Sequence, residues 1–176
     1  FAQRHITDWL ARRKLEVVPP VLTDFFMQNF VNRRTNVQTH LQRQKAPAFI
    51  YDGLYKIVRQ QIERVNRTAG RFRYFTPLGD IFHEAEEGRK VISLNAQFGE
   101  GWLLPAEIMS YARQGIKNVI SLQPFGCIAN QIVARGVEKK IKTFYPDLNL
   151  LSLDFDSGVS EVNITNRLLL FADKIK

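Results

Sequence analysis

The chain has one cysteine, Cys127, among its 176 residues. A single cysteine cannot form an internal disulfide, and cannot by itself build a zinc or iron–sulfur site. Apolar runs approaching the roughly 18–20 residues of a membrane span are also missing. No basic and then apolar leader opens the sequence, so we expect a cytoplasmic protein rather than a secreted or membrane-spanning one. The first residue is Phe1 rather than Met, and we expect a fragment of a larger multidomain protein.

Nucleotide-binding motifs are absent or incomplete. The pair Gly99 and Gly101 begins like a dinucleotide fingerprint, but position 104, where the third glycine would fall, is Leu104, and Glu100 would repel a pyrophosphate. No Gly-Lys-Ser/Thr sequence occurs, so the chain gives no support to ATP hydrolysis. The two glycines are equally compatible with a tight strand-to-helix turn and with the close approach of a ligand.

Positive charge is concentrated in the first part of the chain. The net charge is +8, and residues 1–73 carry 14 Lys/Arg against 5 Asp/Glu, whereas residues 90–176 carry 10 against 8. Solvated helix faces explain this pattern most simply. A basic region could also attract an acidic protein surface, anionic lipid or nucleic acid, and a nucleic-acid site would use Arg33, Arg34, Arg43 and Lys45.

Helical periodicity dominates the first half of the sequence. A short apolar stripe ends at Pro19-Pro20, and Leu22, Phe25, Phe26 and Phe30 then share one helical face. The clearest spacing runs from Tyr51 to Val65 and predicts an amphipathic helix of about five turns. We expect a helical segment over residues 1–75, with a connection over 76–89 that includes one short helix at 81–88.

Alternating strands and helices are predicted in the second half. Apolar runs at 91–94, 118–122 and 149–153 predict strands, and helices are predicted over 105–114, 129–144 and 161–174. This alternation indicates parallel strands with right-handed crossovers. We therefore expect residues 90–176 to form an α/β domain, a three-layer open parallel sheet of the Rossmann/flavodoxin-like βαβαβα type.

Ligands of such sheets bind where the carboxyl ends of the strands meet helix N-termini. Three loops qualify here, and Cys127 follows a predicted strand at the start of a helix, where a thiolate nucleophile or metal ligand would be stabilised. A buried, inert cysteine is the alternative. A histidine base for a cysteine hydrolase is not at hand, because His5, His40 and His83 all lie in the helical half. The candidate site residues are Gly99, Glu100, Gly101, Trp102, Gln123, Pro124, Phe125, Gly126, Cys127, Asp154 and Asp156.

Two carboxylates, Asp154 and Asp156, leave the last predicted strand together. Such a pair could bind a hard cation or act as acid and base. Capping of the next helix is the alternative, for which Asp156, Ser157 and Ser160 are all suitable. The residues alone leave both interpretations open.

Several of these motifs together resemble one known family. The run Gly99–Leu104, the segment Gln123–Cys127 and the run Asp154–Asp156, followed by Ser160–Asn163, occur in an order and spacing similar to the C-terminal region of 2-hydroxyacyl-CoA dehydratase activators. This family is also called the acyl-CoA dehydratase activase-related proteins. The resemblance covers about residues 91–170.

The resemblance implies a multidomain cytoplasmic protein with an ATPase part upstream and a dehydratase-like part in this region. It implies that Cys127 is one thiolate ligand of an iron–sulfur cluster whose other ligands lie on other segments, so no complete cofactor site is expected in this chain. Partners implied are other domains of the same protein, an acyl-CoA or a dehydratase subunit. The alternative function is a non-catalytic docking module that binds an acidic partner domain through its basic helices.

Overall fold

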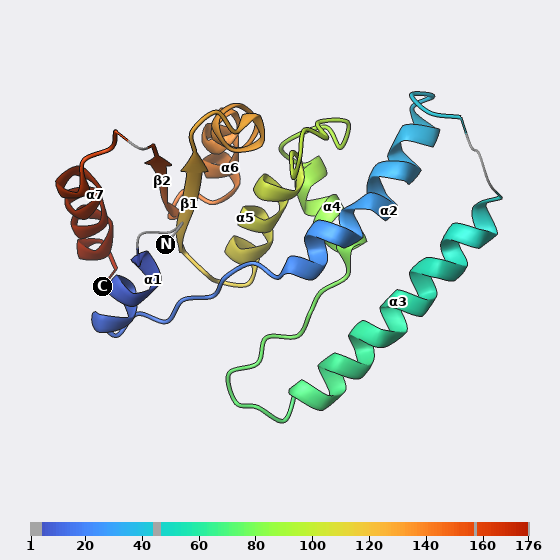
Figure 1. Ribbon diagram of the computed structural model, residues 1–176, viewed down its shortest axis with the longest axis horizontal. Helices are drawn as coiled ribbons and strands as arrows, with labels where there is room; N and C mark the ends of the chain where they lie inside the picture. Colours follow the sequence, from blue (N-terminus) through green and yellow to red (C-terminus); the bar gives the residue numbers. More distant parts are fainter. Residues whose placement is uncertain (1–4, 44–46, 157, 176) are drawn as a thin grey trace.

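A computed structural model describes residues 5–43, 47–156 and 158–175. In this part of the chain helices dominate, and a small sheet lies near the C-terminal end (Figure 1). The helices are α1 (Ile6–Arg12), α2 (Leu22–Gln38), α3 (Ala48–Ala69), α4 (Ile81–Arg89), α5 (Leu103–Arg113), the π-helix η1 (Ala129–Ala134), α6 (Glu138–Phe144) and α7 (Glu161–Asp173).

The sheet described by these residues has two parallel strands, β1 (Asn118–Pro124) and β2 (Asn149–Phe155). Asn118 pairs with Asn149 at one end of the ladder and Pro124 with Phe155 at the other. Both strands lie where the sequence predicts them, and each continues two residues further. Their parallel pairing requires the crossover that η1 and α6 provide.

The predicted three-layer open parallel sheet is wrong. Residues 91–94, the predicted first strand, form turns instead of a strand. The N–H groups of Val91 and Ile92 both donate to the carbonyl of Gly88, which wraps this segment around the end of α4. Leu94 is buried among helices, and Val91 lies in the cluster that α5 and α6 form against one face of the sheet, so neither residue pairs with β1 as a strand. A short apolar run signals burial, and burial between helices satisfies it as well as a central strand does.

The predicted helix over 129–144 is divided in the structure. Its first part is a π-helix, and a turn at Val137 separates it from α6. Gly136 immediately precedes the turn, and glycine lowers the cost of leaving helical geometry. The interruption lets Glu138 at the start of α6 form a hydrogen bond with Ser152 of β2.

Three groups of buried side chains hold the elements together. The first joins α2 and α3 to α4 and α5, and its largest member is Trp102. The second packs α1 and α7 on one face of the sheet, and the third packs α5 and α6 on the other. The first group draws residues from both sides of the predicted connection at 76–89, and the domain boundaries themselves stay predictions.

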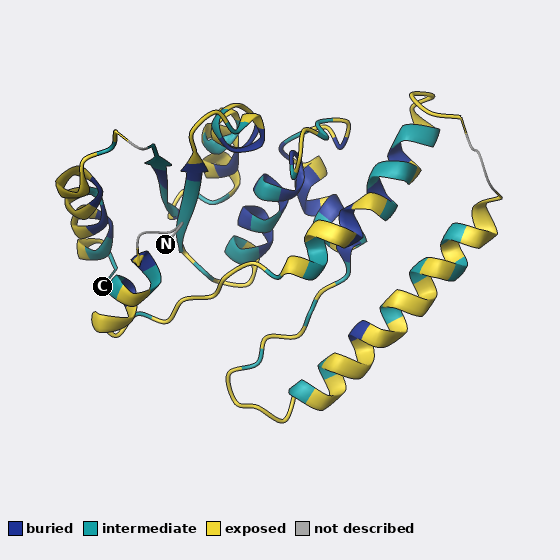
Figure 2. Cartoon of the chain, in the orientation of Figure 1, coloured by how far each residue is buried: buried dark blue, intermediate teal, exposed yellow. Residues whose placement is uncertain are grey.

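Much of α2 and α3 is exposed (Figure 2), and the exposed residues include large apolar ones. In α2 the face of Leu22, Phe25 and Phe26 is exposed, whereas Met27 and Val31 are buried. In α3 the buried residue is Ile62. No helix in the described ranges has both the length and the apolar run needed to cross a membrane.

Candidate functional site

The loop after β1 lies at the carboxyl end of the sheet. The chain leaves Pro124 through Phe125 and Gly126, whose φ of 73° is in the left-handed region that favours glycine. The N–H of Phe125 donates to the carbonyl of Phe155 at 2.9 Å, and that of Cys127 donates to Pro124 at 3.2 Å. These bonds hold the loop to the end of β2 and place Cys127 at the start of η1.

The thiol of Cys127 is half-buried. The side-chain amide of Asn130 donates to its sulfur at 3.1 Å, and the amide of Gln131 donates to the carbonyl of Pro124 at 3.3 Å. Sulfur is a weak acceptor, so the Asn130 contact orients the side chain more than it stabilises the fold. Cys127 is therefore accessible in part and held in one orientation.

The donor set around Cys127 does not fit a complete iron–sulfur cluster. Such clusters are held by about four cysteine or histidine side chains. Within the described residues, no group of three or more His, Cys, Asp and Glu side chains is placed to share a metal ion. This chain can supply one thiolate, and a cluster would need its other ligands from other segments.

The glycine loop lies against the start of η1. A Cβ atom on Gly99 would come within 3.8 Å of the Cβ of Ala129. A Cβ on Gly101, whose φ is 34°, would lie only 2.0 Å from the carbonyl oxygen of Ala96. The close backbone approach is therefore a sufficient reason for glycine at position 101.

Two neighbours in this loop have different environments. Trp102 is fully buried, and its indole N–H donates to Asn32 of α2 at 2.6 Å, so it belongs to the core rather than to the loop edge. Glu100 is half-buried, and its charge contributes to raising the pKa of Glu107. The loop thus contributes backbone and Glu100 to the site edge, while Trp102 anchors it.

Gln123 is fully buried near the end of β1. Its amide nitrogen donates to the hydroxyl of Ser121 at 2.8 Å, whereas its side-chain oxygen has no partner among the described residues. A buried acceptor without a donor is costly, by about 1–3 kcal/mol. Gln123 is therefore a buried polar group with an unsatisfied acceptor, four residues before Cys127.

Asp154 is an anchor between elements. Arg135 donates to both of its carboxylate oxygens at 2.9 and 3.4 Å, and Arg167 of α7 lies 3.5 Å away. Arg167 also donates to the carbonyl of Ser152 at 2.6 Å. A carboxylate shared by two guanidinium groups is compensated, so Asp154 ties the crossover, β2 and α7 together.

Asp156 closes a turn beyond β2. Its carboxylate accepts from the N–H of Gly158 at 3.2 Å. Ser160 is the N-cap residue of α7 by backbone position, but its side chain makes no capping bond. Ser157, the other predicted cap, lies outside the described residues. Asp154 thus bonds to arginine side chains, whereas Asp156 bonds to a backbone N–H.

A buried acidic group was missed from the sequence. Burial raises the pKa of Glu107 to about 8 and that of Glu84 to about 7, and nearby Asp24 adds to both shifts. The hydroxyl of Ser110 donates to Glu84 at 2.8 Å, which partly offsets the effect of burial. A signal was present, because Leu103, Leu104 and Tyr111 place Glu107 on an apolar face of its helix.

No model of a known protein family matches the chain, and neither do curated proteins or solved structures.

Proposed function

We propose that this chain is the C-terminal, dehydratase-like domain of a 2-hydroxyacyl-CoA dehydratase activator, as its motif series suggests. In this role the Cys127 loop forms one wall of an iron–sulfur or acyl-CoA site, and other segments complete that site. Cys127 supplies one thiolate, held in orientation by Asn130. An iron–sulfur cluster would supply low-potential electron transfer. The net charge of +8 favours an anionic CoA ester.

One observation carries the proposal: the motif segments, although far apart in sequence, lie together at the carboxyl end of the sheet. Gly99 lies near Ala129, since a Cβ added to it would come within 3.8 Å of the Ala129 Cβ, and the Phe125 backbone bonds to Phe155. Arg135 joins η1 to Asp154. The ends of parallel strands are where α/β proteins bind ligands, so the convergence supports a shared site.

The test is anaerobic iron–sulfur reconstitution of the full-length protein with Cys127→Ser. We expect lower iron content and an altered cluster spectrum. Phe125→Ser is the matched control, since Phe125 is 76% exposed in the same loop and carries no metal donor. Its iron content should equal that of the unmodified protein. Unchanged iron and spectrum in Cys127→Ser would show that this residue is not a ligand.

A docking function is the second candidate, and the surface of α3 favours it. This 22-residue helix exposes Leu54, Ile57 and Val65 together with basic side chains. Exposed apolar side chains flanked by positive charge are typical of surfaces that bind an acidic partner. Arg59 is excluded from that set because it donates to the carbonyl of Gly79 at 2.7 Å and lies near Asp80.

Charge reversal distinguishes docking through the α3 surface from binding through net charge alone. Lys56→Glu, Arg64→Glu and Arg67→Glu together should abolish binding to immobilised polyglutamate, used here as an acidic surface. The control is Lys139→Glu, Lys140→Glu and Lys142→Glu in α6, which changes the net charge equally at other exposed positions. Equal loss in both variants would mean that net charge, rather than the α3 surface, determines binding.

A further inference from the structure

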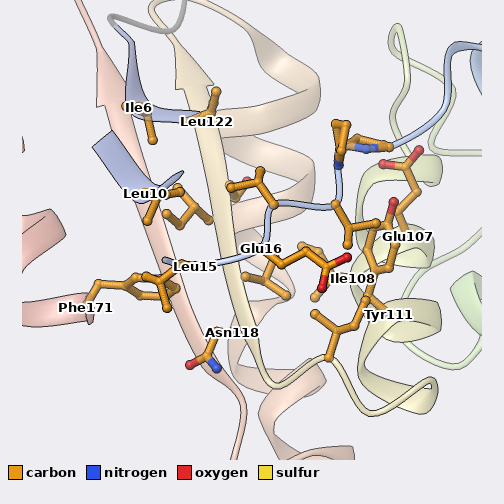
Figure 3. A pocket seen from close by; sticks show the side chains of 18 of the residues that line it. Ile6, Leu10, Leu15, Glu16, Glu107, Ile108, Tyr111, Asn118, Leu122 and Phe171 are labelled. Atoms are coloured by element: carbon orange, nitrogen blue, oxygen red, sulfur yellow. The ribbon is translucent and has the colours of Figure 1, made fainter. Parts of the chain in front are cut away.

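A cavity of about 570 Å³ runs along β1, and we call it the β1 groove (Figure 3). Every residue from Gly115 to Leu122 lines it. Side chains of consecutive strand residues point to opposite faces, so an unbroken lining means that the groove follows the edge of the strand rather than one face. Helix α5 forms the opposite wall, and the segment Leu15–Pro20 crosses in front of β1.

The edge of β1 in this groove has unused hydrogen-bonding groups. The carbonyl of Lys117 accepts from Asn149, and the N–H of Phe125 donates to Phe155, so the odd-numbered residues of β1 bond to β2. In a parallel ladder the even-numbered residues then face away from β2. Among the described residues, no backbone bond reaches Ile120 or Leu122 on that side.

Charge in the groove is unevenly distributed. Two carboxylates line it, Glu16 on the crossing segment and Glu107 on α5, and Glu16 extends toward the helix that carries Glu107 and Tyr111 (Figure 3). Asp24, Glu84 and Glu100 add negative potential at Glu107, whereas Lys117 is the cation among the lining residues. A positively charged side chain would be favoured beside Glu16, and it would also favour the ionised form of Glu107, whose pKa is raised to about 8 by burial.

Most of the other lining residues are apolar, with Leu10, Ile108 and Ile120 among them, and a few, such as Asn118 and Ser121, are polar. An exposed strand edge is a template for another strand, and a sheet of two strands is marginal in stability without a third. A second copy of the chain is a poor occupant, because its own β1 edge lies behind the same helix and the same crossing segment. The unused backbone groups of β1 match the backbone of an incoming strand, and the negative charge of the groove matches a basic side chain on it.

We propose that the β1 groove binds an extended polypeptide strand that is not part of this 176-residue chain. This strand pairs with the edge of β1 at Ile120 and Leu122. Alternate side chains of this strand are apolar and fill the groove, and one Lys or Arg reaches Glu16 and Glu107. The strand adds to the sheet on the side opposite β2, as in strand-addition complexes.

The test is amide hydrogen exchange by NMR on the 176-residue chain. The probe is a capped peptide that alternates Val and Thr and has one central Lys. At a peptide concentration of about ten times Kd, protection of the Ile120 and Leu122 amides should rise about tenfold. The amides of Val119 and Ser121 are the internal control, because they already bond to β2 and should change little.

Two further measurements test the details. A peptide N-methylated at the amides that would face β1 should not bind, since it cannot pair with the edge. Glu16→Gln with Glu107→Gln should weaken the Lys peptide about tenfold and leave a peptide with Val in place of Lys unchanged. The Val peptide is the matched control, because it binds the same groove without a positive charge.

Three results would overturn the proposal. The first is strong protection of Ile120 and Leu122 in the chain alone at low concentration, which would mean that the edge is already paired. The second is concentration-dependent protection without peptide, which would identify a second copy as the occupant. The third is no peptide binding while Val119 and Ser121 remain protected, because the sheet would then be folded and its edge closed to a strand.

Discussion

The indole N–H of Trp102 donates to the side-chain oxygen of Asn32 at 2.6 Å, across 70 positions of sequence. This bond joins the fully buried start of α5 to α2. Asn32→Ala should lower the free energy of unfolding by about 1–3 kcal/mol, because the indole donor would stay buried without a partner. Urea denaturation would measure it.

Asn29→Ala is the control for this substitution, since Asn29 is exposed and bonds only locally to Phe26. It should change stability by less than about 0.5 kcal/mol. Equal effects of the two substitutions would mean that the Trp102 bond does not stabilise the core.

Gly101 tolerates no side chain. Gly101→Ala should destabilise the protein by about 3 kcal/mol or more, because the new Cβ would lie 2.0 Å from the Ala96 carbonyl at a φ of 34°. Gly53→Ala should instead stabilise it by about 0.5–1 kcal/mol, since Gly53 lies within α3 with open space around it. Thermal unfolding of both variants checks the opposite signs.

Stability should fall as pH rises from about 4.5 to about 8. Burial raises the pKa of Glu84 to about 7 and of Glu107 to about 8, from an ordinary value of 4.5. In that window the unfolded chain has ionised these groups while the folded chain keeps them protonated, so the unfolded state binds fewer protons. Their stabilising effect is complete below about 4.5 and is lost above about 8.

Melting temperature against pH would measure this dependence. Glu107→Gln should flatten the decrease, because glutamine does not titrate. Glu161→Gln, at an exposed position on α7, should leave the slope unchanged. A slope that is the same in the wild type and Glu107→Gln would exclude Glu107 as a source.

The ion pairs of Asp154 should contribute modestly to the free energy of unfolding. Asp154→Asn removes the charge shared by Arg135 and Arg167, and because all three are partly exposed we expect a loss of about 1 kcal/mol. High salt should reduce the difference from wild type. Asp147→Asn, at an exposed position, is the control and should have no measurable effect; equal losses in both variants would contradict the anchor role.

Local patterns were enough to predict many elements. The apolar spacing between Tyr51 and Val65 lies within α3, and the predicted strands at 118–122 and 149–153 are β1 and β2. Cys127 lies directly after β1, as predicted. These features depend on contacts between neighbours in sequence, and periodicity records such contacts.

Tertiary surroundings decided the features that the sequence pattern could not predict. Val91 and Leu94 are predicted to form a strand but form a buried turn segment, and Trp102 is predicted to be a loop residue but lies in the core. The side-chain oxygen of Gln123 is buried without a partner among the described residues, and the sequence gives no sign of this burial. Which groups surround a residue depends on segments far away in the chain.

The sequence by itself determined where helices and two strands form and where the single cysteine stands. Only the tertiary structure decided that, in the described residues, no strand pairs with β1 on the side away from β2, that Glu107 is buried beside other carboxylates, and that this edge of β1 faces a groove. The physical reason is that hydrogen-bond pairing, desolvation and cavities are set by how distant elements pack, whereas helix and strand periodicity is set within each element.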